Sequence, residues 1–199
     1  MAGMIFNLLG IFVFLFLFWK RLKEDYITNQ IFSTASLILI GIILSNLIAK
    51  SFFPDWWFWL GFTGILSGLS LAIFRYGLRF FETSDAAVVS LLPWLGLIFL
   101  ADSIANSSLT SLIGSLIILA LSLLYFFFDT HYKKFFWYKS GRVGFSGFSI
   151  MGIFFLIRAA VAVAFPTVLS FSSNYESLLS GITAFISFLL VFNLAQQKT

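Results

Sequence analysis

Arg158 is the residue whose type and position in this chain point most directly to chemistry. It falls inside a long apolar segment, about seven residues from the segment's end and therefore roughly 10 Å along a helix. A guanidinium at that depth in a membrane needs an anionic partner, because an unpaired charge in lipid is costly. We expect this partner to be Asp102, Glu176 or a lipid phosphate. The sequence favours an internal tie to Asp102 and a lipid-headgroup site equally.

Further polar residues lie toward the same end of other apolar segments. We expect them to meet Arg158 in one polar cavity that opens toward the outer leaflet. Hydrogen bonding between helices is the alternative role for each of them. The candidate lipid-binding residues are Arg158, Asn106, Thr63, Asn46, Asp102 and Ser103.

The residue types that support other chemistry are scarce. The chain has no Cys, which excludes disulfides, thiolate metal sites and a Cys nucleophile. Its single His, His131, falls in a basic segment far from Arg158, where we expect it to be solvated. The sequence contains no metal-ligand cluster, phosphate loop or catalytic triad, so no metal, no cofactor and no particular catalytic residue is expected.

The composition defines the elements that must position these residues. Hydrophobic residues make up 60% of the 199 residues and charged residues only 10%, too little polar surface to cover a soluble protein. A membrane-spanning helix needs roughly 20 apolar residues. We therefore predict an all-α integral membrane protein, a single transmembrane domain over residues 1–199 with about seven helices. The net charge of +4 is spread over short clusters, which favours a membrane surface and not nucleic acid.

The basic residues predict how the chain is threaded. Ten of the 12 Lys and Arg fall in alternating loops or at the segment ends beside them, Lys50 alone falls on the other side, and Arg158 lies within a segment. Because Lys and Arg concentrate in cytoplasmic loops, we expect the amino terminus outside and the carboxyl terminus in the cytoplasm. The predicted helices cover residues 4–19, 31–49, 57–74, 86–105, 109–128, 144–165 and 178–194. The ten cytoplasmic residues are Lys20, Arg21, Lys23, Arg75, Arg79, Lys133, Lys134, Lys139, Arg142 and Lys198.

Two finer predictions concern helix ends and helix packing. Thr83 or Ser84 is expected to cap the helix predicted from residue 86, with Asp85 in its first turn. Small residues gather at 61–68 and 144–152, and such residues let helix backbones approach closely in lipid.

Several segments follow one another in an order that resembles a known family. The basic segment 18–24 ends the first helix, the Gly-rich segment 61–68 begins the third, and Asp85 precedes Pro93 in the fourth. Segment 100–106 ends in Asn106, and segment 140–158 leads to Arg158. In this order the chain resembles the prolipoprotein diacylglyceryl transferases, seven-helix enzymes of the bacterial cytoplasmic (inner) membrane. The resemblance extends over most of the chain, as a pattern.

The resemblance implies an activity and partners. It implies transfer of diacylglyceryl from phosphatidylglycerol to a lipoprotein cysteine, with a prolipoprotein signal peptide as the second partner. Arg158 matches a late Arg of the family, Asn106 the last Asn of its signature, and Gly64 a Gly of the third helix. Asn46 replaces an Arg, and Thr63 replaces a His.

Because of these replacements, two functions remain open. The chain is either a diverged transferase or a non-catalytic relative that binds anionic lipid or acts as a scaffold. A transporter or channel is the third alternative, and it is disfavoured because the sequence has no chain of intramembrane acids and no repeat of broken helices.

Overall fold

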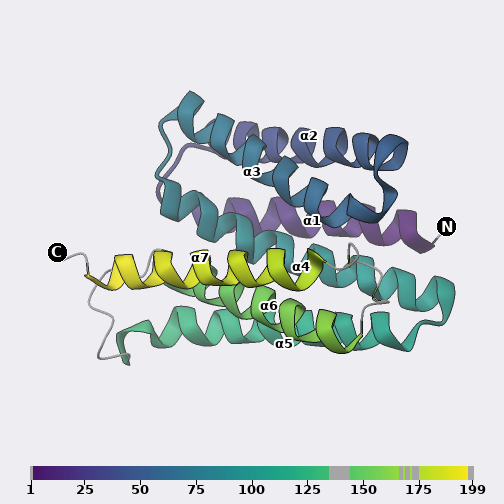
Figure 1. Cartoon of the computed structure of the whole chain (residues 1–199). Coiled ribbons are helices and arrows are strands. Elements are labelled where there is room, and N and C mark those ends of the chain that lie inside the picture. Colours follow the sequence, from purple (N-terminus) through teal and green to yellow (C-terminus); the bar gives the residue numbers. More distant parts are fainter. Residues whose placement is uncertain (1, 135–143, 166–167, 169–170, 172–174, 197–199) are drawn as a thin grey trace.

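The computed structural model of the chain is all-helical (Figure 1). It describes residues 2–134, 144–165, 168, 171 and 175–196. Within these ranges seven helices are long and apolar enough to cross a membrane, which agrees with the predicted number. Short 3-10 helices, η1 (Pro54–Trp56) and η2 (Tyr132–Lys134), precede α3 and follow α5. The helices are α1 (Ala2–Leu22), α2 (Thr28–Phe52), α3 (Trp57–Tyr76), α4 (Phe80–Asn106), α5 (Leu109–His131), α6 (Phe145–Ala164) and α7 (Glu176–Gln196).

Helix α4 begins six residues earlier than the sequence predicts. Its first residue is Phe80 rather than residue 86, and Arg79 precedes it in an extended conformation. The prediction that Thr83 or Ser84 caps this helix is therefore wrong. Both side chains are buried within the helix, and the Thr83 hydroxyl donates to the Arg79 carbonyl at 2.9 Å. The helix runs through these polar residues to Asp85, whose partners on other helices are described below.

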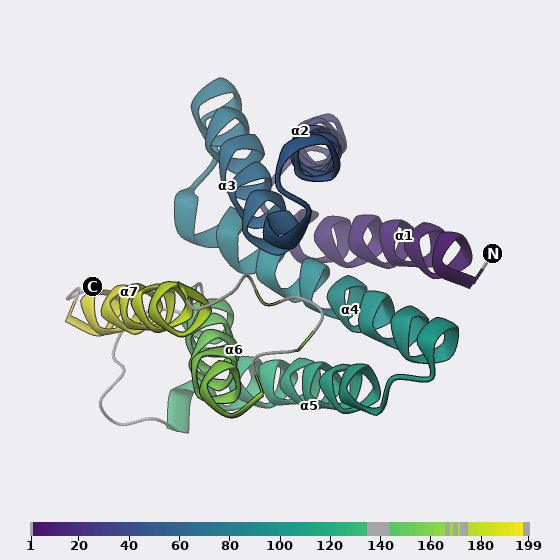
Figure 2. The same cartoon turned by 45° about the vertical axis from the view of Figure 1, so that its right-hand side comes forward.

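The helices pack as a set of pairs around α4. The closest pairs are α2 with α3, α1 with α4, α6 with α7, and α4 with α5. Figure 2 shows α4 running between α1 on one side and α5 and α6 on the other, with α2 and α3 side by side. Helix α4 is therefore the element through which the other helices are placed relative to one another.

Glycines allow the closest of these contacts, between α2 and α3. A Cβ atom on Gly64 would overlap the carbonyl oxygen of Gly41 and the Ser45 hydroxyl. A Cβ on Gly68 would lie 2.5 Å from the carbonyl oxygen of Leu37. The predicted close approach of small residues is thus confirmed at these two positions of α3. At Gly61 an added Cβ would meet no atom within 4 Å, so this glycine is not needed for packing.

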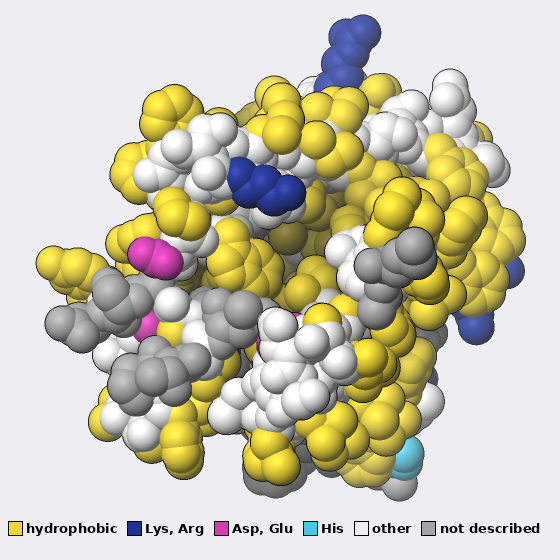
Figure 3. Space-filling model, turned by 90° about the vertical axis from the view of Figure 1, so that its right-hand side faces the viewer, with side chains coloured by type: hydrophobic (Ala, Val, Ile, Leu, Met, Phe, Trp, Pro, Cys, Tyr) yellow, Lys and Arg dark blue, Asp and Glu magenta, His cyan; other side chains and the backbone are white. Residues whose placement is uncertain are grey.

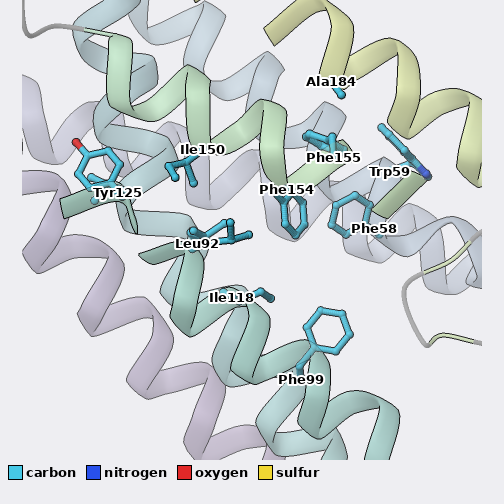
Figure 4. Packing of buried hydrophobic residues seen from close by; sticks show 12 residues of the cluster. Phe58, Trp59, Leu92, Phe99, Ile118, Tyr125, Ile150, Phe154, Phe155 and Ala184 are labelled. Carbon is cyan, nitrogen blue, oxygen red and sulfur yellow. The ribbon is translucent and has the colours of Figure 1, made fainter. Parts of the chain in front are cut away.

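Buried apolar side chains form separate clusters. One lies between α1, α2 and α4 and includes Phe14 and Phe18. Another joins α4, α5 and α6, and the first turn of α3 reaches it through Phe58 and Trp59 (Figure 4). Helix α3 therefore meets α6 through aromatic side chains, with Phe58 beside Phe154 in the close view.

The outer surface is apolar, as expected for helices surrounded by lipid. Phe74 is 89% exposed and Val163 78% exposed, and hydrophobic side chains cover much of the face in Figure 3, which is hollowed near its middle. In a chain whose helices are this long and apolar, such a surface faces hydrocarbon. Three basic residues of the predicted cytoplasmic set, Lys139, Arg142 and Lys198, lie outside the described residues.

Candidate functional site

Arg158 forms a buried ion pair with Glu176. The Arg158 side chain lies near the end of α6, and Glu176 is the first residue of α7. Nε of the guanidinium donates to Glu176 Oε1 at 3.1 Å, and Nη2 donates to the same oxygen at 2.5 Å. Both residues are buried, Arg158 with 5% and Glu176 with 1% of its surface exposed. Glu176 was one of the three partners expected from the sequence, and the structure selects it.

The Glu176 carboxylate joins three helices. Trp59, in the first turn of α3, donates its indole N–H to Oε2 at 2.8 Å. Ser180, one turn further along α7, donates its hydroxyl to Oε1 at 2.7 Å. Both carboxylate oxygens therefore accept hydrogen bonds from buried groups, which offsets the cost of removing the charge from water.

Aromatic rings surround the guanidinium of Arg158. Its Cζ atom lies 3.7 Å from the centroid of the Phe58 ring, 5.1 Å from that of Phe171 and 5.8 Å from that of Phe154. A cation over the face of an aromatic ring is attracted by the ring quadrupole, and this attraction is strongest where water is excluded. The rings therefore hold the guanidinium in place without neutralising its charge.

A cavity of about 200 Å³ adjoins Arg158. Its walls come from α4, α5, α6 and the residues that follow α6, and they are almost entirely apolar. Arg158 is the charged residue and Thr110 the hydroxyl residue of the described lining. A charged group beside an apolar space between helices is the kind of site that binds an amphipathic molecule. The apolar lining residues are Phe99, Ile113, Gly114, Ile117, Ile118, Phe154, Ile157, Val161, Phe165, Val168 and Phe171.

Asp102 is not the partner of Arg158, so the predicted tie between these two residues is wrong. Asp102 Oδ1 accepts a hydrogen bond from the Asn106 side chain at 2.7 Å, and Oδ2 accepts a short one from the Ser111 hydroxyl. The carboxylate thus joins the end of α4 to the start of α5. Because α4 turns Asp102 toward α5, its charge is used there and not at α6.

The other predicted site residues do not line the Arg158 cavity. Thr63 is exposed on α3 and donates to the carbonyl of Leu60, one turn earlier. Asn46 on α2 and Ser103 on α4 are half-buried, and neither belongs to the described cavity lining. The structure therefore does not bring the predicted polar set together around Arg158. Lipid binding by these residues stays a prediction.

A second buried carboxylate, Asp85, lies at the opposite end of the bundle. Arg21 Nη2 donates to Asp85 Oδ2 at 2.6 Å and Nε donates to it at 2.9 Å, and the Tyr125 hydroxyl donates to the same oxygen at 2.9 Å. Asp85 Oδ1 accepts the backbone N–H of Gly147 at 2.7 Å. Arg21 also contacts Asp129 at 3.2 Å. We name these five residues the Asp85 cluster; they join α1, α4, α5 and α6.

The contact with Gly147 places Asp85 at the amino-terminal end of α6. Gly147 lies in the first turn of that helix, where backbone N–H groups have no partner within the helix. A carboxylate is favoured there because it accepts such a hydrogen bond and complements the helix dipole. A Cβ on Gly147 would lie 2.5 Å from Asp85 Oδ1, so the contact requires glycine.

The Asp85 cluster is not among the sites predicted from the sequence. Arg21 was assigned to the cytoplasmic basic group, and Asp85 was assigned to a helix start. One signal was available, since Arg21, Asp85 and Asp129 each lie at the same predicted end of an apolar segment. Opposite charges at one end of a bundle are expected to pair.

A surface group lies beside this cluster, where the chain enters α4. Arg79, the residue before α4, pairs through Nη1 with Glu82 Oε1 at 2.8 Å. Tyr26 donates its hydroxyl to Glu82 Oε2 at 2.6 Å. Partial burial and this hydrogen bond raise the pKa of Tyr26. The hydrogen bond to Glu82 likewise raises the pKa of Arg79.

The fold and composition define the class of this protein as a helical multi-pass membrane protein. In comparisons with known proteins, the chain matches no protein-family model, no curated protein and no solved structure. Among the residues that the structure describes, no group of three or more His, Asp and Glu side chains is placed to hold a metal ion. The function is therefore inferred from the geometry at Arg158.

Proposed function

We propose that this protein binds an anionic phospholipid, of the phosphatidylglycerol type, at Arg158 without chemically converting it. The phosphate of the lipid contacts the guanidinium, and part of an acyl chain fills the adjoining cavity. At about 200 Å³ the cavity is smaller than the roughly 300–1,000 Å³ typical of small-molecule sites, so most of the lipid stays in the bilayer.

The observation that carries this proposal is the position of Arg158 in the cavity wall. Among the described lining residues it is the charged one, and all the others except Thr110 supply an apolar surface within or beside the membrane-spanning helices. Guanidinium and phosphate form two parallel hydrogen bonds when they pair. This combination matches the two chemical parts of a phospholipid.

Lipid retention tests the proposal. We expect the protein in nanodiscs that contain phosphatidylglycerol and phosphatidylcholine to retain phosphatidylglycerol preferentially, as measured by native mass spectrometry. Arg158→Met should abolish this preference. Arg75→Met, which removes an exposed cation of α3 at the opposite end, is the matched control and should retain it. Equal retention of both lipids by the unaltered protein, or an unchanged preference in Arg158→Met, would refute the proposal.

We further propose that the amino terminus lies outside and the carboxyl terminus in the cytoplasm, in a bacterial inner membrane. The support is the distribution of basic residues. Lys20, Lys23, Arg79 and Lys133 lie at the end of the bundle that holds the Asp85 cluster, whereas Lys50 lies at the other end. Basic residues concentrate on the cytoplasmic side. Single cysteines, introduced at exposed positions into this Cys-free chain, report the orientation through labelling by an impermeant reagent.

Diacylglyceryl transfer is the second candidate function, and the carboxylate beside Arg158 is the observation that favours it. In this reaction the cysteine sulfur forms a thioether bond to a glyceryl carbon, the bond from that carbon to the phosphate oxygen breaks, and glycerol phosphate leaves. Arg158 would neutralise the leaving phosphate, and Glu176 would take the thiol proton.

Incubation with phosphatidylglycerol and a peptide that carries a lipoprotein signal sequence tests the transfer reaction. A diacylglyceryl thioether that forms with the unaltered protein, and not with Arg158→Met, would establish this reaction and replace the non-catalytic proposal. Retained lipid without thioether would exclude it.

A further inference from the structure

Arg158 contacts both Glu176 and the cavity. Arg158 belongs to the described lining of the cavity, and Glu176 does not. Nε and Nη2 of the guanidinium are both directed to the carboxylate, at 3.1 and 2.5 Å. An anion that arrives through the cavity therefore meets a cation whose charge is already neutralised by the protein.

Displacement of Glu176 would leave a buried negative charge. If a phosphate took Arg158, the carboxylate would lose the cation that pairs with it and would keep the neutral donors Trp59 and Ser180. Glu176 is 1% exposed, so water cannot replace the lost cation. A buried carboxylate without a counterion is strongly disfavoured, and protonation removes the charge. A protonated carboxyl group keeps acceptor capacity for the indole and the hydroxyl.

We propose that a phosphate-bearing anion and Glu176 compete for Arg158, and that Glu176 takes up one proton for each monoanion bound. This inference rests on the proposed lipid site and adds its regulation. The added anion and the added proton cancel, so the net charge of the buried site stays unchanged. Glu176 is faced by Arg158 from α6, by Trp59 from α3 and by Ser180 from its own helix.

Coupling between proton and lipid makes binding dependent on pH. Protonation of Glu176 promotes lipid binding at Arg158, and lipid binding promotes protonation. Phosphatidylglycerol should therefore bind more tightly as the pH falls. Uptake of one proton corresponds to a change of up to about tenfold in the dissociation constant per pH unit. The Glu176 carboxylate thus competes with the lipid phosphate for Arg158, and low pH ends this competition by protonating the carboxylate.

The experiment measures phosphatidylglycerol retention in nanodiscs across acidic and neutral pH, for the unaltered protein and for Glu176→Gln. The glutamine cannot compete as an anion, so we expect tight binding that no longer changes with pH. Asp55→Asn is the matched control, because it neutralises an exposed carboxylate of η1 at the same end, outside the proposed site. It should keep the pH dependence of the unaltered protein.

A second variant covers the case in which Glu176→Gln does not fold. Trp59→Phe removes the indole donor of Oε2 and leaves the ion pair in place. The carboxylate is then more easily protonated, so the rise in lipid retention should move to higher pH. An unshifted profile in this variant, or a Glu176→Gln protein that keeps the pH dependence, would overturn the exchange.

The failure of this inference and the failure of the lipid site give different results. If neither the unaltered protein nor Arg158→Met prefers phosphatidylglycerol at any pH, the lipid site itself is refuted. If a preference depends on Arg158 but not on pH or on Glu176, only the exchange is refuted. Glycerol phosphate without acyl chains forms a further arm. Its retention with the same dependence on pH and Arg158 would support the exchange and assign the site to free phosphate esters.

Discussion

Two buried carboxylates, Asp85 and Glu176, stand at opposite ends of the bundle and illustrate two uses of the same chemistry. Each pairs with an arginine of another helix and accepts further hydrogen bonds. Asp85 joins four helices and accepts a backbone N–H, in a contact where even a methyl group on Gly147 has no room. Glu176 pairs with an arginine that forms part of a cavity wall.

The difference teaches which of the two clusters is suited to function. A tightly packed cluster that joins many helices fixes their positions. It leaves no room for water or a ligand to compensate a change in its charge. A charge pair beside a cavity allows a ligand to exchange with one partner. The Asp85 cluster therefore fixes the amino-terminal end of α6, and the same helix carries Arg158 to the cavity at its other end.

The comparison predicts its largest effect at Asp85. Asp85→Asn removes the charged acceptor of the four hydrogen bonds from Arg21, Tyr125 and Gly147, while Arg21 keeps its contact with Asp129. A hydrogen bond to a charged group contributes about 1.5–3 kcal/mol, so the summed loss is the largest of those compared here. We expect a large fall in the unfolding temperature in detergent. Asp102→Asn, at a half-buried position, should lower it much less. Equal effects of the two substitutions would contradict the role assigned to Asp85.

Trp59→Phe probes the Glu176 end and should have a smaller effect on stability. It removes a hydrogen bond to a buried charge, worth about 1.5–3 kcal/mol. Trp94→Phe is a matched control, since Trp94 is equally buried but its indole donates to the neutral side chain of Asn7 at 3.3 Å. Thermal unfolding of both variants isolates the contribution of the charged acceptor. The interpretation fails if Trp94→Phe is the more damaging change.

Gly147→Ala tests whether the close contact between Gly147 and Asp85 fixes the position of α6. The added methyl group must push Asp85 and α6 apart, and overpacking of this kind costs about 1–3 kcal/mol. Gly181→Ala in α7 is the control, because no atom lies within 4 Å of its added Cβ. Alanine favours the helix, so this variant should gain about 0.5–1 kcal/mol. Chemical denaturation in detergent should thus give changes of opposite sign.

The smallest expected effect concerns Tyr26, at the surface beside the Asp85 cluster. Its pKa is raised above the usual value of 10.0, so the folded state holds the phenolic proton more tightly than the unfolded state. Stability should therefore fall as the pH rises above about 10. Tyr26→Phe removes the titrating group and should lack this part of the loss. A pH series of unfolding temperatures compares the two proteins, and identical slopes would contradict the assignment.

The number and type of the helices follow from the sequence because hydropathy is a local property. The apolar segments are long enough to span a membrane, and each became a helix. The first residue of α4 could not be predicted from the sequence. An Asp is common at the start of a helix, and the sequence does not show that Asp85 binds groups of other helices instead. The pairing of Arg79 with Glu82 depends on residues only three apart in the chain, where α4 begins, so it is a local contact.

By itself the sequence determined that this is a bundle of apolar helices with one arginine deep in a segment that requires an anionic partner. It named Asp102, Glu176 and a lipid phosphate as candidates, and it favoured Asp102 and the lipid equally. Only the tertiary structure decided between them, because the choice depends on how each helix is rotated about its axis and on which faces meet. The same rotations placed Asp85 between four helices, and no local pattern in the chain encodes that arrangement.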